Sequence, residues 1–172
     1  MTKIAASILS ADFANLKHDC TRLLEAGVDL MHFDVMDGHF VPNISYGAPV
    51  LKCLHAAMPD VYYDVHLMIS DPARYAADFA RAGASLITFH LEAVPDTAEE
   101  VIAAIRAAGC QVGISIRPGT PVEAGFPVSG VVDLILVMSV EPGFRRAEVP
   151  PHQPPRALPP SVPSAPAAAV IP

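Results

Sequence analysis

Apolar runs alternate with amphipathic segments from residue 4 to about residue 140. The runs are short and nearly continuous, which is typical of parallel strands that are buried on both faces. Between them, apolar residues recur every three or four positions, the spacing of one helix face. The pattern predicts strands over residues 4–9, 28–36, 61–68, 85–90, 111–116 and 131–140, helices over residues 13–27, 49–57, 71–83 and 96–109, and a short helix after residue 121.

Local signals support several of these boundaries. Asp71-Pro72 places proline at the first position of a helix, where its missing N–H costs nothing. Asp96-Thr-Ala-Glu99 has the pattern of a capping box. Glycines, which end helices readily, follow three of the predicted helices at Gly27, Gly83 and Gly109.

Strands that alternate with helices predict a parallel sheet covered by helices, because parallel strands need a crossover connection. Polar residues gather where strands end, at Asp34, His66, His90 and Glu141. The carboxyl ends of the strands carry the active site in an α/β barrel, but also in an open doubly wound sheet. The pattern alone leaves both architectures open.

The amino-acid composition of the chain changes after Phe144, where proline becomes frequent. Residues 145–172 hold nine of the eighteen prolines. That density of proline predicts an extended, largely disordered tail over residues 145–172, following one folded domain over residues 1–144. Pro151 and Pro154 fit the P-x-x-P pattern of ligands for SH3-like modules, although this pattern arises freely in proline-rich sequence.

Composition narrows the class of protein. A chain of 172 residues with 52% hydrophobic residues and a mean hydropathy of +0.38 suits one domain with a sizeable core. The net charge of -7, without any run of Lys or Arg, argues against nucleic acid or an anionic membrane surface as a partner. We expect a cytoplasmic protein, because no apolar run reaches the length of a membrane span. Three cysteines without C-x-x-C spacing argue against a disulfide framework.

The candidate chemistry centres on three residues. His32 and Asp34 are two positions apart on one predicted strand, so their side chains project to the same face. The next strand would bring His66 to the same point. Two imidazoles and one carboxylate predict a catalytic divalent-metal site with room for substrate, since burying three unpaired polar groups would be costly.

Three further polar residues have other expected roles. We expect His90 to be a hydrogen-bonded core residue. Asp64 shares a strand face with His66, and is either a partner that orients a ligand or a solvated or salt-bridged carboxylate. Asp37 is expected to shape the loop that it forms with Gly38.

Five segments carry a resemblance to a known family: ASILSADF at residues 6–13, HFDVMDGHFVPN at 32–43, DVHLM at 64–68, RPGTP at 117–121 and VMSVEPGF at 137–144. They resemble ribulose-phosphate 3-epimerases, and they are collinear with that family from about residue 3 to residue 144. The resemblance implies a (β/α)8 TIM barrel and a metal-dependent isomerase of carbohydrate metabolism that interconverts D-ribulose 5-phosphate and D-xylulose 5-phosphate in the pentose phosphate pathway. It also implies one divalent metal ion, Fe2+, Zn2+, Mn2+ or Co2+, as cofactor.

The resemblance also assigns roles to individual residues. It implies that Asp34 is a catalytic acid/base group and that His32, Asp34 and His66 are metal ligands. The substrate-binding residues would be Ser7, His66, Gly143 and Phe144. The epimerase reaction removes a proton from the carbon next to a ketone and returns one to the opposite face, through an ene-diolate whose charge a metal ion can stabilise.

The resemblance stops after Phe144. The family continues with a second pair of glycines and two more strands, whereas Arg145-Arg146 follows here. The family's second acid/base aspartate, which is also its fourth metal ligand, lies on the missing strand seven. The sequence therefore predicts an incomplete barrel of about six strands, with inactive or impaired catalysis, and a homo-oligomer only where the full barrel forms.

Two accounts of this departure remain open. One is a shift of reading frame after codon 144 in an epimerase gene. The other is a non-catalytic metal-binding or interaction fragment that uses its proline-rich tail as a docking segment.

Overall fold

The computed structural model describes residues 2–143 and 167–169 of the chain. Its sheet is entirely parallel, and neighbouring strands follow one another in chain order. A doubly wound sheet reverses its strand order at a switch point, so this order identifies a half-barrel of the (β/α)8 type. The six strands of the alternating region are β1 (Ala5–Ser7), β2 (Leu30–Met36), β3 (Tyr63–Met68), β4 (Leu86–His90), β5 (Gln111–Ile116) and β6 (Leu134–Val137).

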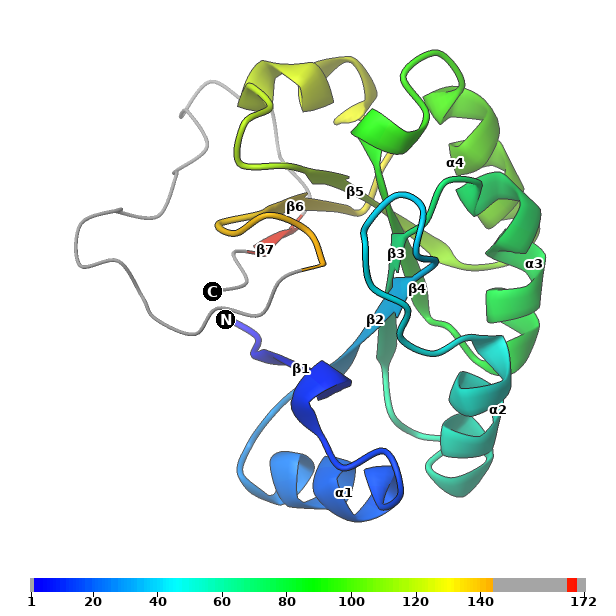
Figure 1. Ribbon diagram of the computed structural model, residues 1–172, viewed down its shortest axis with the longest axis vertical. Coiled ribbons are helices and arrows are strands. Elements are labelled where there is room, and N and C mark those ends of the chain that lie inside the picture. Colours follow the sequence, from blue (N-terminus) through cyan, green and yellow to red (C-terminus); the bar gives the residue numbers. More distant parts are fainter. Residues whose placement is uncertain (1, 144–166, 170–172) are drawn as a thin grey trace.

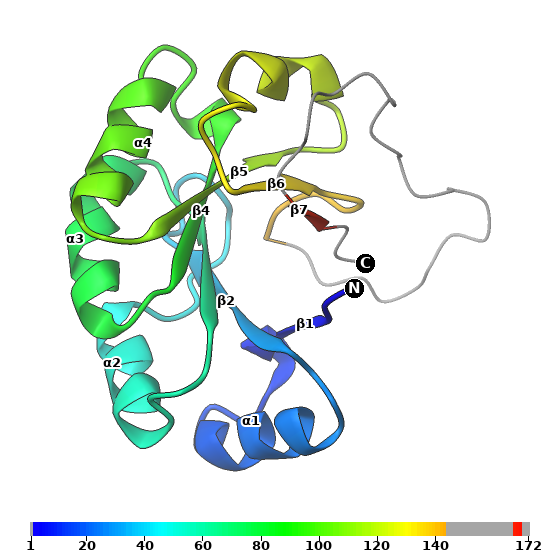
Figure 2. The same ribbon diagram turned by 180° about the vertical axis from the view of Figure 1, so that it is seen from behind.

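The helices lie along the outer side of this curved sheet (Figures 1 and 2). Short 3-10 helices occupy several of the loops at the strand ends. The α-helices are α1 (Leu16–Glu25), α2 (Ala48–Ala57), α3 (Pro72–Ala82) and α4 (Ala98–Ala107), and the 3-10 helices are η1 (Ile8–Ser10), η2 (Leu91–Ala93) and η3 (Val122–Val128).

Most predicted boundaries agree with the structure to within a few residues. Asp71 caps α3 as predicted, because its side chain accepts a hydrogen bond from the backbone N–H of Arg74 at 3.2 Å. The capping box predicted at Asp96 is wrong: α4 begins one residue later, after Thr97, which makes no side-chain capping hydrogen bond. The first strand is shorter than predicted, because Ile8 already belongs to a 3-10 helix.

The tail contributes one strand that the sequence did not predict. β7 (Ala167–Ala169) pairs in parallel with β6. The proline argument does not apply to this segment, since no proline interrupts residues 167–171. The rest of the predicted disordered tail, residues 145–166 and 170–172, lies outside the described residues. Within the described part of the chain, β1 pairs with β2 alone, so the sheet is not closed into a barrel.

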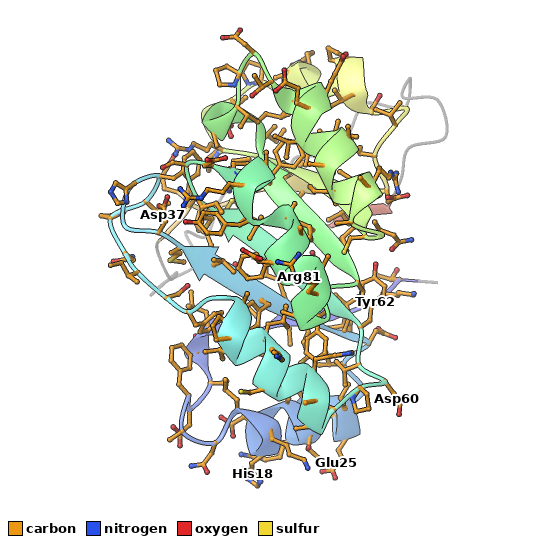
Figure 3. The ribbon with its side chains drawn as sticks, turned by 90° about the vertical axis from the view of Figure 1, so that its right-hand side faces the viewer. His18, Glu25, Asp37, Asp60, Tyr62 and Arg81 are labelled. Carbon is orange, nitrogen blue, oxygen red and sulfur yellow. The ribbon has the colours of Figure 1, made fainter. Side chains whose placement is uncertain are left out.

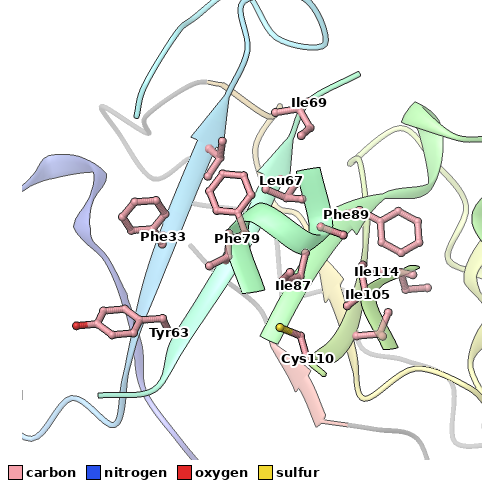
Figure 4. Packing of buried hydrophobic residues seen from close by; sticks show 14 of the residues in the cluster. Phe33, Tyr63, Leu67, Ile69, Phe79, Ile87, Phe89, Ile105, Cys110 and Ile114 are labelled. Atoms are coloured by element: carbon pink, nitrogen blue, oxygen red, sulfur yellow. The ribbon is translucent and has the colours of Figure 1, made fainter. Parts of the chain in front are cut away.

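The hydrophobic core lies between the sheet and the helices. Phe33, Leu67, Ile87 and Phe89 project from three adjacent strands, and Phe79 of α3 packs among the side chains of this layer (Figure 4). All five are buried, and burying a side chain of this size contributes about 1.5–3 kcal/mol. This layer fixes the strands against the helices.

The opposite face of the same strands carries buried polar side chains. Successive residues of a strand point to opposite faces, so the residues between the core positions share the inner face. These strands therefore read as apolar runs interrupted at alternate positions, and polar groups occupy strand interiors as well as strand ends. The buried polar residues are His32, Asp34, Asp64, His66, Thr88, His90 and Ser115.

Candidate metal centre

Strand register brings the three predicted ligands together. Asp34 on β2 lies opposite His66 on β3, and His32 is two residues earlier on the same face of β2. The Oδ1 atom of Asp34 is 3.2 Å from His32 Nε2 and 3.0 Å from His66 Nδ1, and these two nitrogens are 3.3 Å apart. Ligand atoms about 2.0–2.1 Å from a tetrahedral metal ion are separated by about 3.3–3.4 Å. The three buried residues therefore form a group that could hold a metal ion, as predicted.

The electrostatics of this group favour a cation between its members. Burial by itself would lower the pKa of His32, but the carboxylates of Asp34 and Asp64 raise that pKa to about 10. Burial would raise the pKa of Asp34, but His32 and His66 hold it well below its usual range. A proton or a metal ion in this position is stabilised by the same carboxylates.

Asp64 orients the first histidine. Its Oδ2 atom lies 2.7 Å from His32 Nδ1, and its Oδ1 atom accepts a hydrogen bond from Thr88 Oγ1 at 3.2 Å. A carboxylate on Nδ1 keeps the proton there and leaves the Nε2 lone pair for a metal ion. Asp64 is only 3% exposed, which excludes a solvated carboxylate. Its partner is His32, because the parallel register places residues 32 and 64 side by side.

His66 is in contact with a further buried histidine, His90, on the adjacent strand β4. His66 Nε2 is 2.9 Å from His90 Nε2, and His90 Nδ1 is 3.2 Å from Glu92 Oε2. The prediction that His90 is a hydrogen-bonded core residue is confirmed, since it has no exposed surface. Burial lowers the pKa of His90 to about 4, partly opposed by Glu92, so its imidazole is neutral near pH 7.

Glu92 is a further residue of this group whose role was not predicted from the sequence. It lies in η2, directly after β4, and its Oε1 atom accepts hydrogen bonds from Arg117 N at 2.7 Å and Thr120 Oγ1 at 2.5 Å. Burial would raise the pKa of Glu92, but these bonds and His90 lower it to about 2. The signal in the sequence was a carboxylate two residues after a histidine that ends a buried strand.

The predicted substrate-binding residues fall into two places. Ser7, at the end of β1, is exposed and donates a hydrogen bond from Oγ to Asp34 Oδ2 at 2.5 Å, beside the candidate ligands. Gly143 follows β6, and its carbonyl accepts a hydrogen bond from Asn43 Nδ2. Its φ of 86° and the closeness of Val41, 2.8 Å from the position of a Cβ, both require glycine. Phe144 lies outside the described residues.

Asp37 shapes the loop after β2, as predicted. Its Oδ1 atom accepts hydrogen bonds from the backbone N–H groups of His39 at 2.8 Å and Phe40 at 2.9 Å. Its Oδ2 atom accepts a third from Ser70 N at 2.8 Å, which ties this loop to the loop after β3. Burial would raise the pKa of Asp37, but the three hydrogen bonds lower it. Figure 3 shows Asp37 at one end of the sheet, with Asp60 and Tyr62 at the other.

A parallel half-barrel with a buried group of two histidines and one carboxylate on its inner face defines an α/β-barrel protein with a candidate divalent-metal centre. Residues 3–151 match the model of the Ribulose-phosphate 3 epimerase family. The chain belongs to the ribulose-phosphate 3-epimerase family.

Named relatives agree with this assignment. The chain is 50% identical over 145 residues to the ribulose-phosphate 3-epimerase, cytoplasmic isoform, of Oryza sativa subsp. japonica, with 83% of this chain and 63% of the relative covered. It is 51% identical over 141 residues to the ribulose-phosphate 3-epimerase of Treponema pallidum, with 82% and 64% covered. The chain thus spans less than two thirds of the length of these relatives.

Solved structures of distant sequence share the fold. The 3-keto-L-gulonate-6-phosphate decarboxylase of Vibrio cholerae superposes with a TM-score of 0.65 at 12% identity, covering 79% of this chain and 62% of that chain. The 3-hexulose-6-phosphate synthase of Salmonella typhimurium gives 0.64 at 16% identity, covering 80% and 64%. At these identities the likeness shows the fold alone. None of the helices in the described part of the chain is long and apolar enough to cross a membrane.

Proposed function

We propose that this chain carries the metal-binding part of a ribulose-phosphate 3-epimerase active site. The reaction is the interconversion of D-ribulose 5-phosphate and D-xylulose 5-phosphate, by proton removal and return at C3. The observation that carries the proposal is the spacing of 3.0–3.3 Å among three ligand atoms, in a chain of this family. Two imidazoles and a carboxylate suit Fe2+, Zn2+, Mn2+ or Co2+. A cytoplasmic location accords with the name of the rice relative.

Asp34 can serve as ligand and as base because its two oxygens have different surroundings. Oδ1 faces the two histidines, whereas Oδ2 faces Ser7, which is exposed. Oδ2 is thus the oxygen that would take the C3 proton, with Ser7 beside it to contact the sugar phosphate. A positioned acid/base group of this kind contributes about 10²–10⁴-fold to a rate. A bound divalent metal ion would supply Lewis-acid stabilisation of the negative charge on the substrate oxygens.

The second acid/base group is what the chain lacks. In the family this group is an aspartate on strand seven, but residues 145–172 contain no aspartate. With Asp34 alone, a proton can be removed from one face of C3 but not returned to the other. We therefore expect the chain to bind a metal ion and to turn over its substrate at least about a hundredfold more slowly than a full-length relative.

A coupled epimerase assay on the purified chain tests the proposal. The chain is loaded with Zn2+, Fe2+, Mn2+ or Co2+ in separate samples, and His32→Asn serves as the variant without a complete ligand set. We expect one metal ion per chain, lost in His32→Asn, and low turnover. Failure of the folded chain to bind any of the four metals contradicts the metal centre, and turnover near that of the rice relative contradicts the predicted impairment.

The alternative is a non-catalytic metal-binding protein, which the missing aspartate favours. Its signature is a folded, metal-loaded chain that catalyses no step on either sugar phosphate. The same samples therefore distinguish the two functions.

A further inference from the structure

A chain of side-chain contacts extends from the candidate metal centre across the next strand, β4. His66 on β3 contacts His90 on the adjacent strand β4. Their Nε2 atoms are 2.9 Å apart, and the centroids of their stacked rings are 5.0 Å apart. His90 Nδ1 then meets Glu92 Oε2 at 3.2 Å. Glu92 is thus linked to a predicted metal ligand through a single imidazole that has no exposed surface.

The positions of the protons follow from the chemistry of these groups. A carboxylate only accepts hydrogen bonds, so His90 must carry a proton on Nδ1. A neutral imidazole protonated on Nδ1 has a bare Nε2, so the proton shared by the two histidines belongs to His66 Nε2. The lone pair of His66 then lies on Nδ1, the nitrogen that faces Asp34 Oδ1 at 3.0 Å.

We propose that Glu92 and His90 are positioning residues that select the tautomer of His66 whose Nδ1 is free to bind a metal ion. The inference rests on the metal-binding function proposed above. It adds to the contact between Asp64 and His32, in which a carboxylate acts directly on a ligand. Here the carboxylate acts through an intervening histidine.

Glu92 is itself held in one orientation. Arg117 N, at 2.7 Å, and Thr120 Oγ1, at 2.5 Å, both donate to Oε1, which leaves Oε2 for His90. The loop after β2 covers the contact: the ring of Phe40 lies 4.9 Å from that of His90, and the Arg117 guanidinium lies 4.2 Å above the Phe40 ring. Shielding from water strengthens hydrogen bonds of this kind.

Glu92→Gln tests the inference because it replaces the hydrogen-bond acceptor that faces His90 Nδ1 by a donor. The two donors at Oε1 fix the glutamine carbonyl there, so its NH2 group faces His90 Nδ1. His90 must then carry its proton on Nε2 and donate to His66 Nε2, which places the proton of His66 on Nδ1. We expect Zn2+ affinity, measured by competition with a chromophoric chelator, to fall about 10–100-fold. Glu100→Gln, the same charge change on the exposed face of α4, should leave the affinity unchanged.

Nitrogen-15 NMR of the histidine rings gives a second readout. In the Zn2+-loaded wild-type chain we expect His66 protonated on Nε2 with Nδ1 bound to zinc, and His90 protonated on Nδ1. Wild-type chain that binds no Zn2+ contradicts the proposed function. Wild-type binding together with a Glu92→Gln affinity within about threefold of it overturns this inference alone. Should Glu92→Gln fail to fold, the wild-type spectrum decides, because a His66 ring protonated on Nδ1 overturns the inference.

Discussion

The contact between Asp64 and His32 predicts a graded loss of metal affinity. The two atoms are 2.7 Å apart, and both residues are almost completely buried. Asp64→Asn keeps the shape: its carbonyl can still accept from His32 Nδ1 while its NH2 group faces the Thr88 hydroxyl, which can also accept. Only the charge is lost. A hydrogen bond to a charged group exceeds a neutral one by about 1–1.5 kcal/mol, which corresponds to about tenfold in affinity.

Asp64→Ala removes the acceptor as well and leaves His32 Nδ1 without a partner in a buried place. We expect Zn2+ affinity to fall about a hundredfold in this variant, which corresponds to about 2.7 kcal/mol. The assay is competition with a chromophoric chelator, on samples whose folding is checked by circular dichroism. Asp60→Asn is the matched control, because Asp60 is an exposed carboxylate in the loop that precedes β3 (Figure 3). A folded Asp64→Ala variant with wild-type affinity would show that Asp64 does not orient His32 for metal binding.

Three further predictions concern stability. Gly113→Ala should lower the free energy of unfolding by about 1–3 kcal/mol in urea titrations, because its Cβ would lie 2.3 Å from Oγ1 of the buried Thr88; Gly130→Ala, with open space around it, should not. The pKa of Glu92 is lowered to about 2 from 4.5, so its ionised form stabilises the fold above pH 4.5 and this contribution is lost as the pH falls towards 2. Urea midpoints from pH 3 to pH 7 should therefore rise more steeply for wild type than for Glu92→Gln, and equal slopes would count against the assignment. Asp37→Ala loses three backbone partners, so limited proteolysis should cut the loop after β2 faster than in wild type, and an unchanged rate would count against its role.

Much of the fold could be predicted from the sequence because clear sequence signals mark several helix and strand boundaries. Asp71-Pro72 marked the start of α3, and the fifth strand was predicted over the residues of β5, Gln111–Ile116. Apolar runs were less informative at β1 and β6, since such a run does not distinguish a strand from a 3-10 turn or an extended loop. β7 is three alanines, a composition that carries no strand signal.

Only those features of the candidate site that depend on positions within one strand could be predicted from the sequence. His32 and Asp34 share a face because of the two-residue repeat of a strand, a local property. The pairing of Asp64 with His32 depends on the register of β2 and β3, which the sequence does not display. The link from His66 to Glu92 through His90 requires the same knowledge for β3 and β4, so it emerged only with the structure.

Isotope exchange at C3 of the substrate tests whether Asp34 serves as the acid/base group of this chain. The metal-loaded chain is incubated in deuterium oxide with D-ribulose 5-phosphate and, separately, with D-xylulose 5-phosphate, and proton NMR follows the C3 signal. Under the proposed function, Asp34 would remove the C3 proton, exchange it with solvent and return a deuteron to the same face. We expect deuterium at C3 of one of the two sugar phosphates, with little conversion to the other and no exchange in Asp34→Asn. Exchange in neither substrate would contradict the role of Asp34 as an acid/base group, and conversion at the rate of a full-length relative would contradict the predicted impairment.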